Sequence, residues 1–174
     1  MKYLYTPIDL AIYFLISNFP VSQEKRILKS LWEQQNSAIL PQHRTSKKLF
    51  RNAIYNDLSK YDCTLDELDE LNLLMKDMDY CYSDGSVNEQ GVIESFFKII
   101  KLQLAYTPDK EYRKIKLRTL LGRFGYKRRS VNLIGYIDEA LRSLGIVTYL
   151  RGHVPCNLAE IKLDDTVIIR LANN

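Results

Sequence analysis

The sequence predicts a mainly α-helical protein, with a helical bundle over residues 1–105 and a smaller domain over 106–174 that ends in a short β-hairpin. Before residue 145, apolar side chains recur at spacings of three and four residues, which is typical of helices packed on a core. After Gly145, two short segments are rich in β-branched residues, which indicates strands. A chain with 46% hydrophobic and 26% charged residues is too apolar to be disordered.

Three helices are expected in the first sixty residues. The first begins at Thr6-Pro7-Ile8-Asp9 and ends near Asn18, because Thr6 can cap the helix, Pro7 suits its first turn and Asp9 favours its positive end. A second helix follows Ser22, and a third starts at Thr45 or Ser46 after a loop over residues 36–44. The side chains expected to face inward are Ile27, Leu28, Leu31 and Trp32 in the second helix and Leu49, Phe50, Ala53, Ile54 and Leu58 in the third.

Two further helices are marked by capping boxes. Thr64-Leu65-Asp66-Glu67 opens an acidic helix whose outward carboxylates form either a solvated surface or a docking face for a basic partner. Its inward side chains are Leu68, Leu71, Leu74, Met75 and Met78. Ser86-Val87-Asn88-Glu89 opens a helix that is apolar nearly all round, so we expect it at the centre of the N-terminal bundle.

The C-terminal part begins with a basic helix after Thr107-Pro108, which ends at Gly125 as a left-handed C-cap. A short turn over residues 126–130 leads to another helix that stops at Gly145. The apolar stripes of these helices are Leu117, Leu120, Leu121 and Phe124 in the first and Ile134, Ile137, Leu141 and Leu144 in the second. Strands are expected at 146–150 and 166–171, with an irregular loop between them.

Charge is distributed unevenly along the chain. The totals of 25 Lys+Arg and 21 Asp+Glu give a net charge of only +4. Residues 62–94 nevertheless carry ten acids and one base, whereas residues 110–129 carry nine bases and one acid. Such asymmetry indicates a polyanionic partner for the basic part.

The order helix, short turn, helix and two strands is that of a winged helix-turn-helix. In this motif the N-terminal end of the second helix meets base edges in the major groove of DNA. The residues available there to contact bases are Lys127, Arg128, Arg129, Ser130 and Asn132. The preceding helix is expected to supply Lys114, Lys116, Arg118 and Arg123 for phosphates, with Arg151 at the tip or base of the wing.

One pattern in this region resembles a known class of domain. Leu120-Leu121-x-x-Phe124-Gly125-x-x-Arg128-Arg129, followed by Ile137, Leu141 and Gly145, resembles winged helix-turn-helix domains of prokaryotic regulators and of mobile-element or defence proteins. The resemblance covers about residues 110–171 and implies binding to duplex DNA, without supplying base contacts. We therefore expect a transcriptional regulator or a DNA-recognition subunit of a larger assembly, with no catalytic residue.

The N-terminal helices are expected to serve a homodimer, a protein partner or localisation. Three other readings remain open. The protein could be an adaptor whose winged helix is structural, or it could bind RNA through the same basic face. It could also be a Mg²⁺-dependent nuclease, because Glu160-Ile161-Lys162 resembles half of such a site, with Asp138 and Glu139 as the nearby upstream acids.

Several classes of site have no signature in the sequence. A Walker loop, a G-x-S-x-G elbow and an H-E-x-x-H motif are all absent, so we expect no cofactor. Cys63, Cys81 and Cys156 are odd in number and far apart, which indicates reduced thiols and a cytoplasmic protein. His153 and Cys156 are too few for a zinc site. No apolar run approaches the length of a membrane span, and the N-terminus lacks the cleavage site of a signal peptide.

Overall fold

A computed structural model of the chain describes residues 5–33, 39–59 and 89–172. The described part is mainly helical and contains one small three-stranded antiparallel sheet. The contacts divide the chain into two compact units, Met1–Glu67 and Leu68–Asn174, hereafter unit 1 and unit 2. The acidic helix expected after Thr64 lies outside the described residues, as do Cys63 and Cys81.

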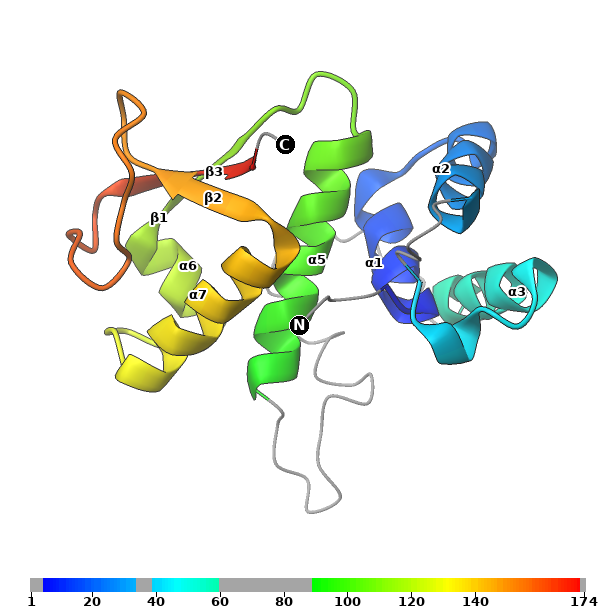
Figure 1. Cartoon of the computed structure of the whole chain (residues 1–174), viewed down its shortest axis with the longest axis horizontal. Coiled ribbons are helices and arrows are strands. Elements are labelled where there is room, and N and C mark those ends of the chain that lie inside the picture. Colours follow the sequence, from blue (N-terminus) through cyan, green and yellow to red (C-terminus); the bar gives the residue numbers. More distant parts are fainter. Residues whose placement is uncertain (1–4, 34–38, 60–88, 173–174) are drawn as a thin grey trace, which may run out of the picture. The chain divides into compact units, whose positions relative to one another are not determined.

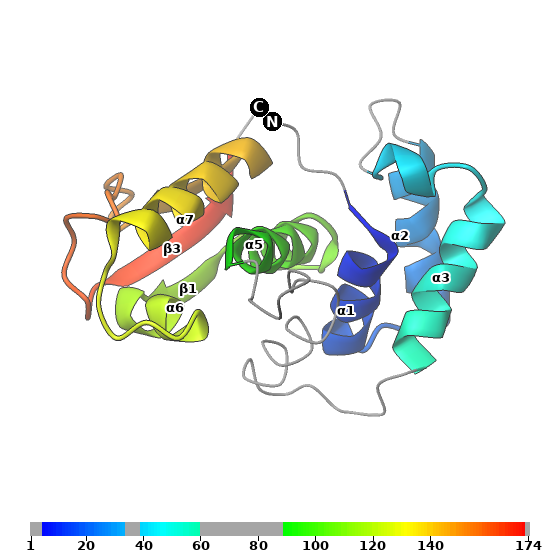
Figure 2. The same ribbon diagram turned by 90° about the horizontal axis from the view of Figure 1, so that it is seen from below.

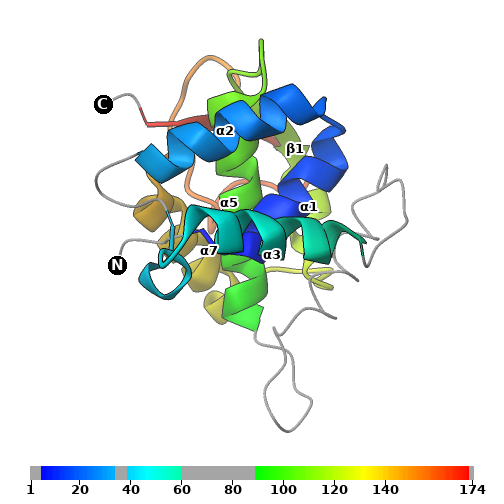
Figure 3. The same cartoon turned by 90° about the vertical axis from the view of Figure 1, so that its right-hand side faces the viewer.

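Unit 1 contains α1 (Pro7–Ser17), α2 (Val21–Glu33), the short 3-10 turn η1 (Pro41–His43) and α3 (Lys47–Ser59). Figure 3 views this unit from the side on which α2 and α3 face the reader. The expected cap of α1 is confirmed, because Thr6 and Asp9 form a reciprocal capping box. Asn18 ends α1 in the left-handed conformation, with its backbone N–H donating to the carbonyl of Phe14 at 3.0 Å.

The core of unit 1 comes from the apolar faces of these helices. Buried side chains include Leu10, Ile12, Phe14, Ile27, Leu31, Phe50 and Ile54. One inward expectation is wrong: the side chain of Leu49 is 62% exposed. Phe50 and Ile54, spaced four apart, point inward, and Leu49 precedes this stripe by one residue, which turns it towards solvent.

Unit 2 contains α5 (Glu89–Tyr106), β1 (Arg113–Lys116), α6 (Leu117–Arg123), α7 (Val131–Leu144), β2 (Ile146–Tyr149) and β3 (Thr166–Leu171). Figure 1 shows α5 beside α7 and the sheet, with which it shares most of its contacts in this unit. The apolar helix expected at the centre of the N-terminal bundle is therefore packed on the C-terminal elements. The division of the chain by contacts accordingly differs from the expected boundary at residue 105.

The sheet has the order β1-β3-β2, with both pairs antiparallel. The strands expected at 146–150 and 166–171 are confirmed as β2 and β3. The basic helix expected from Thr107 onwards is wrong in its first part, because residues 113–116 form β1 and α6 begins only at Leu117. Buried Ile115 and Leu117 alternate with exposed Lys114 and Lys116. A repeat of two residues is typical of a strand.

The core of unit 2 lies between α5, α6, α7 and one face of the sheet. The buried residues that fill it include Phe96, Ile100, Leu120, Leu133, Ile137, Leu141, Val167 and Ile169. The ring of Phe96 meets that of Phe124 edge to face, with ring centres 5.3 Å apart. Lys101 donates from Nζ to the carbonyl of Leu144 at 2.7 Å, which ties α5 to the C-terminal end of α7. Among the described helices, none has the combination of length and apolar character needed to cross a membrane.

Candidate nucleic-acid interface

The junction between α6 and α7 is fixed at both ends by local hydrogen bonds. Gly125 adopts a φ of +83°, which only glycine tolerates well. Its N–H donates to the carbonyl of Gly122 at 3.0 Å, and the N–H of Tyr126 donates to that of Leu121 at 3.1 Å. These two bonds form a Schellman motif, so the expected left-handed cap is confirmed. Ser130 caps α7, with its Oγ accepting from the N–H of Leu133 at 3.1 Å.

The segment between these caps is also tied to α5. The hydroxyl of Tyr126 donates to the Glu89 carboxylate at the start of α5. This hydrogen bond to an anion is the main reason that the pKa of Tyr126 lies above its ordinary value. The turn is thus held at three points, and the residues between them are presented in a defined conformation.

Two of the five residues expected to contact bases are basic and exposed. Lys127 and Arg128 project from the turn, and neither has a hydrogen bond or ion pair with any other described residue. Asn132 is also exposed, in the first turn of α7. These residues stand immediately before α7 and in its first turn, and the partial positive charge of a helix N-terminus attracts anions. They form the part of the predicted site that is available to a ligand.

The other two residues of that group are engaged by the fold. Arg129 is half-buried and donates from Nη1 to the carbonyls of Leu158 at 3.2 Å and Ala159 at 2.6 Å. It therefore fastens the turn to the loop between β2 and β3. The hydroxyl of Ser130 is occupied as the cap of α7. Figures 1 and 2 show the turn and the β2–β3 loop together at the left-hand end of unit 2.

The residues expected to contact phosphates come from two elements. Lys114 and Lys116 are exposed, but they lie on β1, not on the helix that precedes the turn. The ammonium of Lys114 sits 5.1 Å from the centre of the Tyr112 ring, within the range of a cation–π contact. Only Arg118 and Arg123 belong to α6.

Arg118 already has an anionic partner. Its Nε and Nη2 each donate to a carboxylate oxygen of Asp164 at 3.0 Å, in the two-pronged geometry that suits a guanidinium and a carboxylate. These hydrogen bonds lower the pKa of Asp164, and the positive charge of Lys116 lowers it further. Binding of a phosphate by Arg118 would require it to leave this carboxylate.

Arg123 is half-buried at the C-terminal end of α6. Its charge lies close enough to Arg113 to contribute to the lowered pKa of that guanidinium, for which burial is the larger cause. Arg113 itself packs over the Phe96 ring and donates to Gln103 at 3.2 Å. Arg123 thus faces a neighbourhood of positive charge beside the core.

Arg151 lies exposed at the tip of a hairpin extension of β2. The N–H of Leu150 donates to the carbonyl of Val154 at 2.7 Å, and Tyr149 pairs with Pro155. The turn between them places Gly152 and His153 at positive φ. Arg151 is therefore carried on a closed turn.

The outer face of the sheet carries a group of side chains that the sequence did not predict. The guanidinium of Arg170 lies 5.4 Å from the centre of the Tyr112 ring and its Nη1 is 3.1 Å from Nε2 of His153. Together with Lys114 on β1, these residues form one cationic and aromatic cluster beside β1 and β3. Thr166, Ile168 and Arg170 occupy every second position of β3 and so share one face of the sheet. This pattern would have indicated the group only after β1 had been recognised as the neighbouring strand.

The residues of the expected nuclease motif lie in the β2–β3 loop. Glu160 accepts a hydrogen bond from Asn157 at 2.9 Å, and both Glu160 and Lys162 are exposed. Within residues 5–33, 39–59 and 89–172, no group of three or more His, Cys, Asp or Glu side chains is arranged to hold a metal ion. Comparison of the chain with known protein families, with curated proteins and with solved structures gives no match.

Proposed function

We propose that unit 2 is a winged helix-turn-helix domain that binds duplex DNA with the N-terminal end of α7. The observation that carries this proposal is the pair Lys127 and Arg128, which are exposed and unpaired among the described residues at a firmly capped helix start. A helix of 14 residues fits the major groove, where an arginine can read guanine and an asparagine adenine. The protein then acts as a transcriptional regulator or as the DNA-recognition subunit of a larger assembly.

The order of elements in unit 2 supports the proposal. The helices α6 and α7 are followed by β2, a long loop and β3, which is the order of the motif. Lys114, Lys116 and Arg151 then supply contacts to the phosphate backbone from the sheet and the wing. Arg129 serves this interface indirectly, by holding the turn against the β2–β3 loop.

The test is a gel-shift titration of the full chain against a pool of random duplex DNA. The double variant Lys127→Ala/Arg128→Ala should bind at least about tenfold more weakly, because lost contacts to a base or phosphate cost about 1–3 kcal/mol each. Arg142→Ala is the matched control, since Arg142 is an exposed arginine at the opposite end of α7. We expect its affinity to stay within about twofold of the wild type.

The same titration separates the alternatives. Equal affinity of the wild type and the double variant would refute the proposed contact surface. Stronger competition by structured RNA than by duplex DNA would assign the same face to RNA. Absence of any salt-dependent binding to either, together with a stable complex in a pull-down, would favour a protein–protein adaptor.

A further inference from the structure

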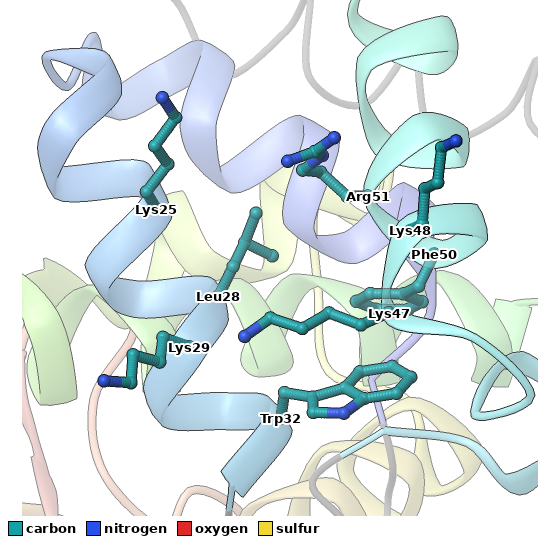
Figure 4. Close-up of a pocket in the computed structure, with 8 residues that line it drawn as sticks. All are labelled: Lys25, Leu28, Lys29, Trp32, Lys47, Lys48, Phe50 and Arg51. Atoms are coloured by element: carbon teal, nitrogen blue, oxygen red, sulfur yellow. The ribbon is translucent and has the colours of Figure 1, made fainter.

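Unit 1 contains a pocket between α2 and α3 with a volume of about 530 Å³ (Figure 4). This is within the size range of pockets that hold small molecules. Each helix contributes four side chains to the lining, which are Lys25, Leu28, Lys29 and Trp32 from α2 and Lys47, Lys48, Phe50 and Arg51 from α3. None of these residues belongs to the proposed DNA-binding surface.

The floor of the pocket is apolar and aromatic. Leu28 and Phe50 are buried, with 6% and 4% of their surface exposed, whereas Trp32 is half-exposed beside them. The rings of Trp32 and Phe50 lie 5.9 Å apart at an angle of 46°. Arg44 donates to the backbone carbonyl of Trp32 at 3.3 Å, which helps to fix this end of α2. Trp32 therefore offers a partly exposed aromatic face to a flat ring, next to the buried ring of Phe50.

The rim of the pocket is cationic. Four lysines and one arginine line the pocket together with its apolar residues, and the lining includes no carboxylate. Nζ of Lys29 forms an ion pair with Oε1 of Glu33 at 3.9 Å. The other four cations have no ion pair within the described part of the chain. Figure 4 shows the side chain of Lys47 extended across the pocket between Leu28 and Trp32. Like charges that line one pocket repel one another, and an anion in the pocket would relieve that repulsion.

Two of these lysines lie where a positive charge does not help to stabilise the helix. Lys47 and Lys48 occupy the first turn of α3, where the positive end of the helix disfavours cations. The same helix end has backbone N–H groups that favour an anion. The lysine ammonium groups, the guanidinium of Arg51 and the helix end therefore all favour a multiply charged anion.

We propose that this pocket binds a nucleotide, with the base against Trp32 and Phe50 and the phosphates on the cationic rim. The proposal goes beyond DNA binding by unit 2 and does not depend on it. A planar base suits the aromatic wall because every base has a π-face that stacks on such rings. The ligand is either a free mononucleotide or a nucleotide of a single strand, and the experiment distinguishes these two sources.

Trp32 is the only tryptophan of the chain, so intrinsic tryptophan fluorescence reports directly on the pocket. The full chain is titrated with ATP, with adenosine, with inorganic tripolyphosphate and with a short single-stranded oligothymidylate. We expect ATP to change the fluorescence with an affinity at least about tenfold higher than that of adenosine or of tripolyphosphate, because base and phosphates are bound together. Tighter binding of the oligonucleotide than of ATP would identify a strand as the source.

The variant Lys47→Ala/Lys48→Ala removes two exposed side chains from the rim, so it should fold normally and bind ATP at least about tenfold more weakly. Arg26→Ala is the matched control, because Arg26 is exposed on α2 but does not line the pocket. The Lys127→Ala/Arg128→Ala variant should keep the response to ATP, so that failure of this proposal and failure of DNA binding are separate results.

Three outcomes would overturn the proposal. One is a response to ATP no stronger than that to tripolyphosphate, which would indicate a site for phosphate alone. Another is equal affinity of the Lys47→Ala/Lys48→Ala and Arg26→Ala variants. The third is a response to phosphatidylserine vesicles but not to ATP or to the oligonucleotide, which would assign the pocket to an anionic membrane surface.

Discussion

Two neighbouring arginines in the turn before α7 have different roles. Arg128 is exposed and available to a ligand, whereas Arg129 is half-buried and donates to two backbone carbonyls of the β2–β3 loop. The sequence indicates only that both are basic and adjacent, and on that basis both are expected at the DNA. The orientation of Arg129 depends on Leu158 and Ala159, about thirty residues away, and so could not be inferred from local sequence.

The role of Arg129 predicts an effect on stability. Arg129→Ala should lower the free energy of unfolding by about 1–3 kcal/mol, because it removes hydrogen bonds from a charged donor. Arg128→Ala, the matched control, should change it by less than about 0.5 kcal/mol, as is usual for an exposed residue without contacts. Denaturation by guanidinium, followed by circular dichroism, measures both. Equal midpoints for the two variants would show that Arg129 does not hold the loop.

At the scale of elements, α2 and α3 are joined by a hydrogen bond between a tyrosine and a buried acid. The hydroxyl of Tyr55 donates to Oε2 of Glu24 at 2.8 Å, and Glu24 is only 8% exposed. Burial, followed by the hydrogen bond and the charge of Glu24, raises the pKa of Tyr55 from 10.0 to about 12. The folded state therefore keeps this phenol protonated at a higher pH than the unfolded state does.

This difference predicts a loss of stability in alkali. A pKa that is higher in the folded state stabilises the protein below pH 10, and this contribution is lost as the pH rises from 10 through about 12. The free energy of unfolding of Tyr55→Phe should fall less steeply over this range than that of the wild type. The control is Tyr112→Phe, which alters an exposed tyrosine. Parallel pH profiles for the wild type and Tyr55→Phe would contradict the assignment.

Other elements show which parts of the fold local sequence predicts. The cap at Thr6, the glycine at 125 and the β-branched residues of β2 and β3 act through neighbours in sequence, and all were predicted. In contrast, β1 has a single apolar residue between basic ones, so it also fits the face of a basic helix. Pairing of Ile115 with Val167 on β3 decides between the two, and that contact joins residues about fifty positions apart.

Helix α5 illustrates the same limit in packing. Its apolar side chains cover nearly its whole circumference, so the pattern predicts burial correctly but does not indicate which elements cover it. Contacts with α7 and β3 place it in unit 2. The pocket of unit 1 escaped prediction for a related reason, since its cations come from two helices and form a cluster only when α2 and α3 pack together.

At the scale of the whole molecule, the net charge of +4 is the sum over segments of opposite charge. Within unit 2, five exposed cations of the proposed DNA-binding surface have no ion pair with a described residue, namely Lys114, Lys116, Lys127, Arg128 and Arg151. Arg118 differs from them because Asp164 already neutralises it. Asp164 thus decides whether Arg118 is available to bind phosphate.

Asp164→Asn should therefore change the salt dependence of DNA binding. Each phosphate contact contributes about −0.9 to the slope of log affinity against log salt, so five contacts give a slope of about −4.5. The variant frees Arg118 for a sixth contact and removes a negative charge, so the slope should become steeper by about 0.9 and binding at low salt should tighten. Glu160→Gln is the control, because Glu160 is an exposed carboxylate of the same loop whose side chain contacts Asn157. Titrations at several salt concentrations measure the slopes, and identical slopes for Asp164→Asn and the wild type would show that Arg118 does not face the DNA.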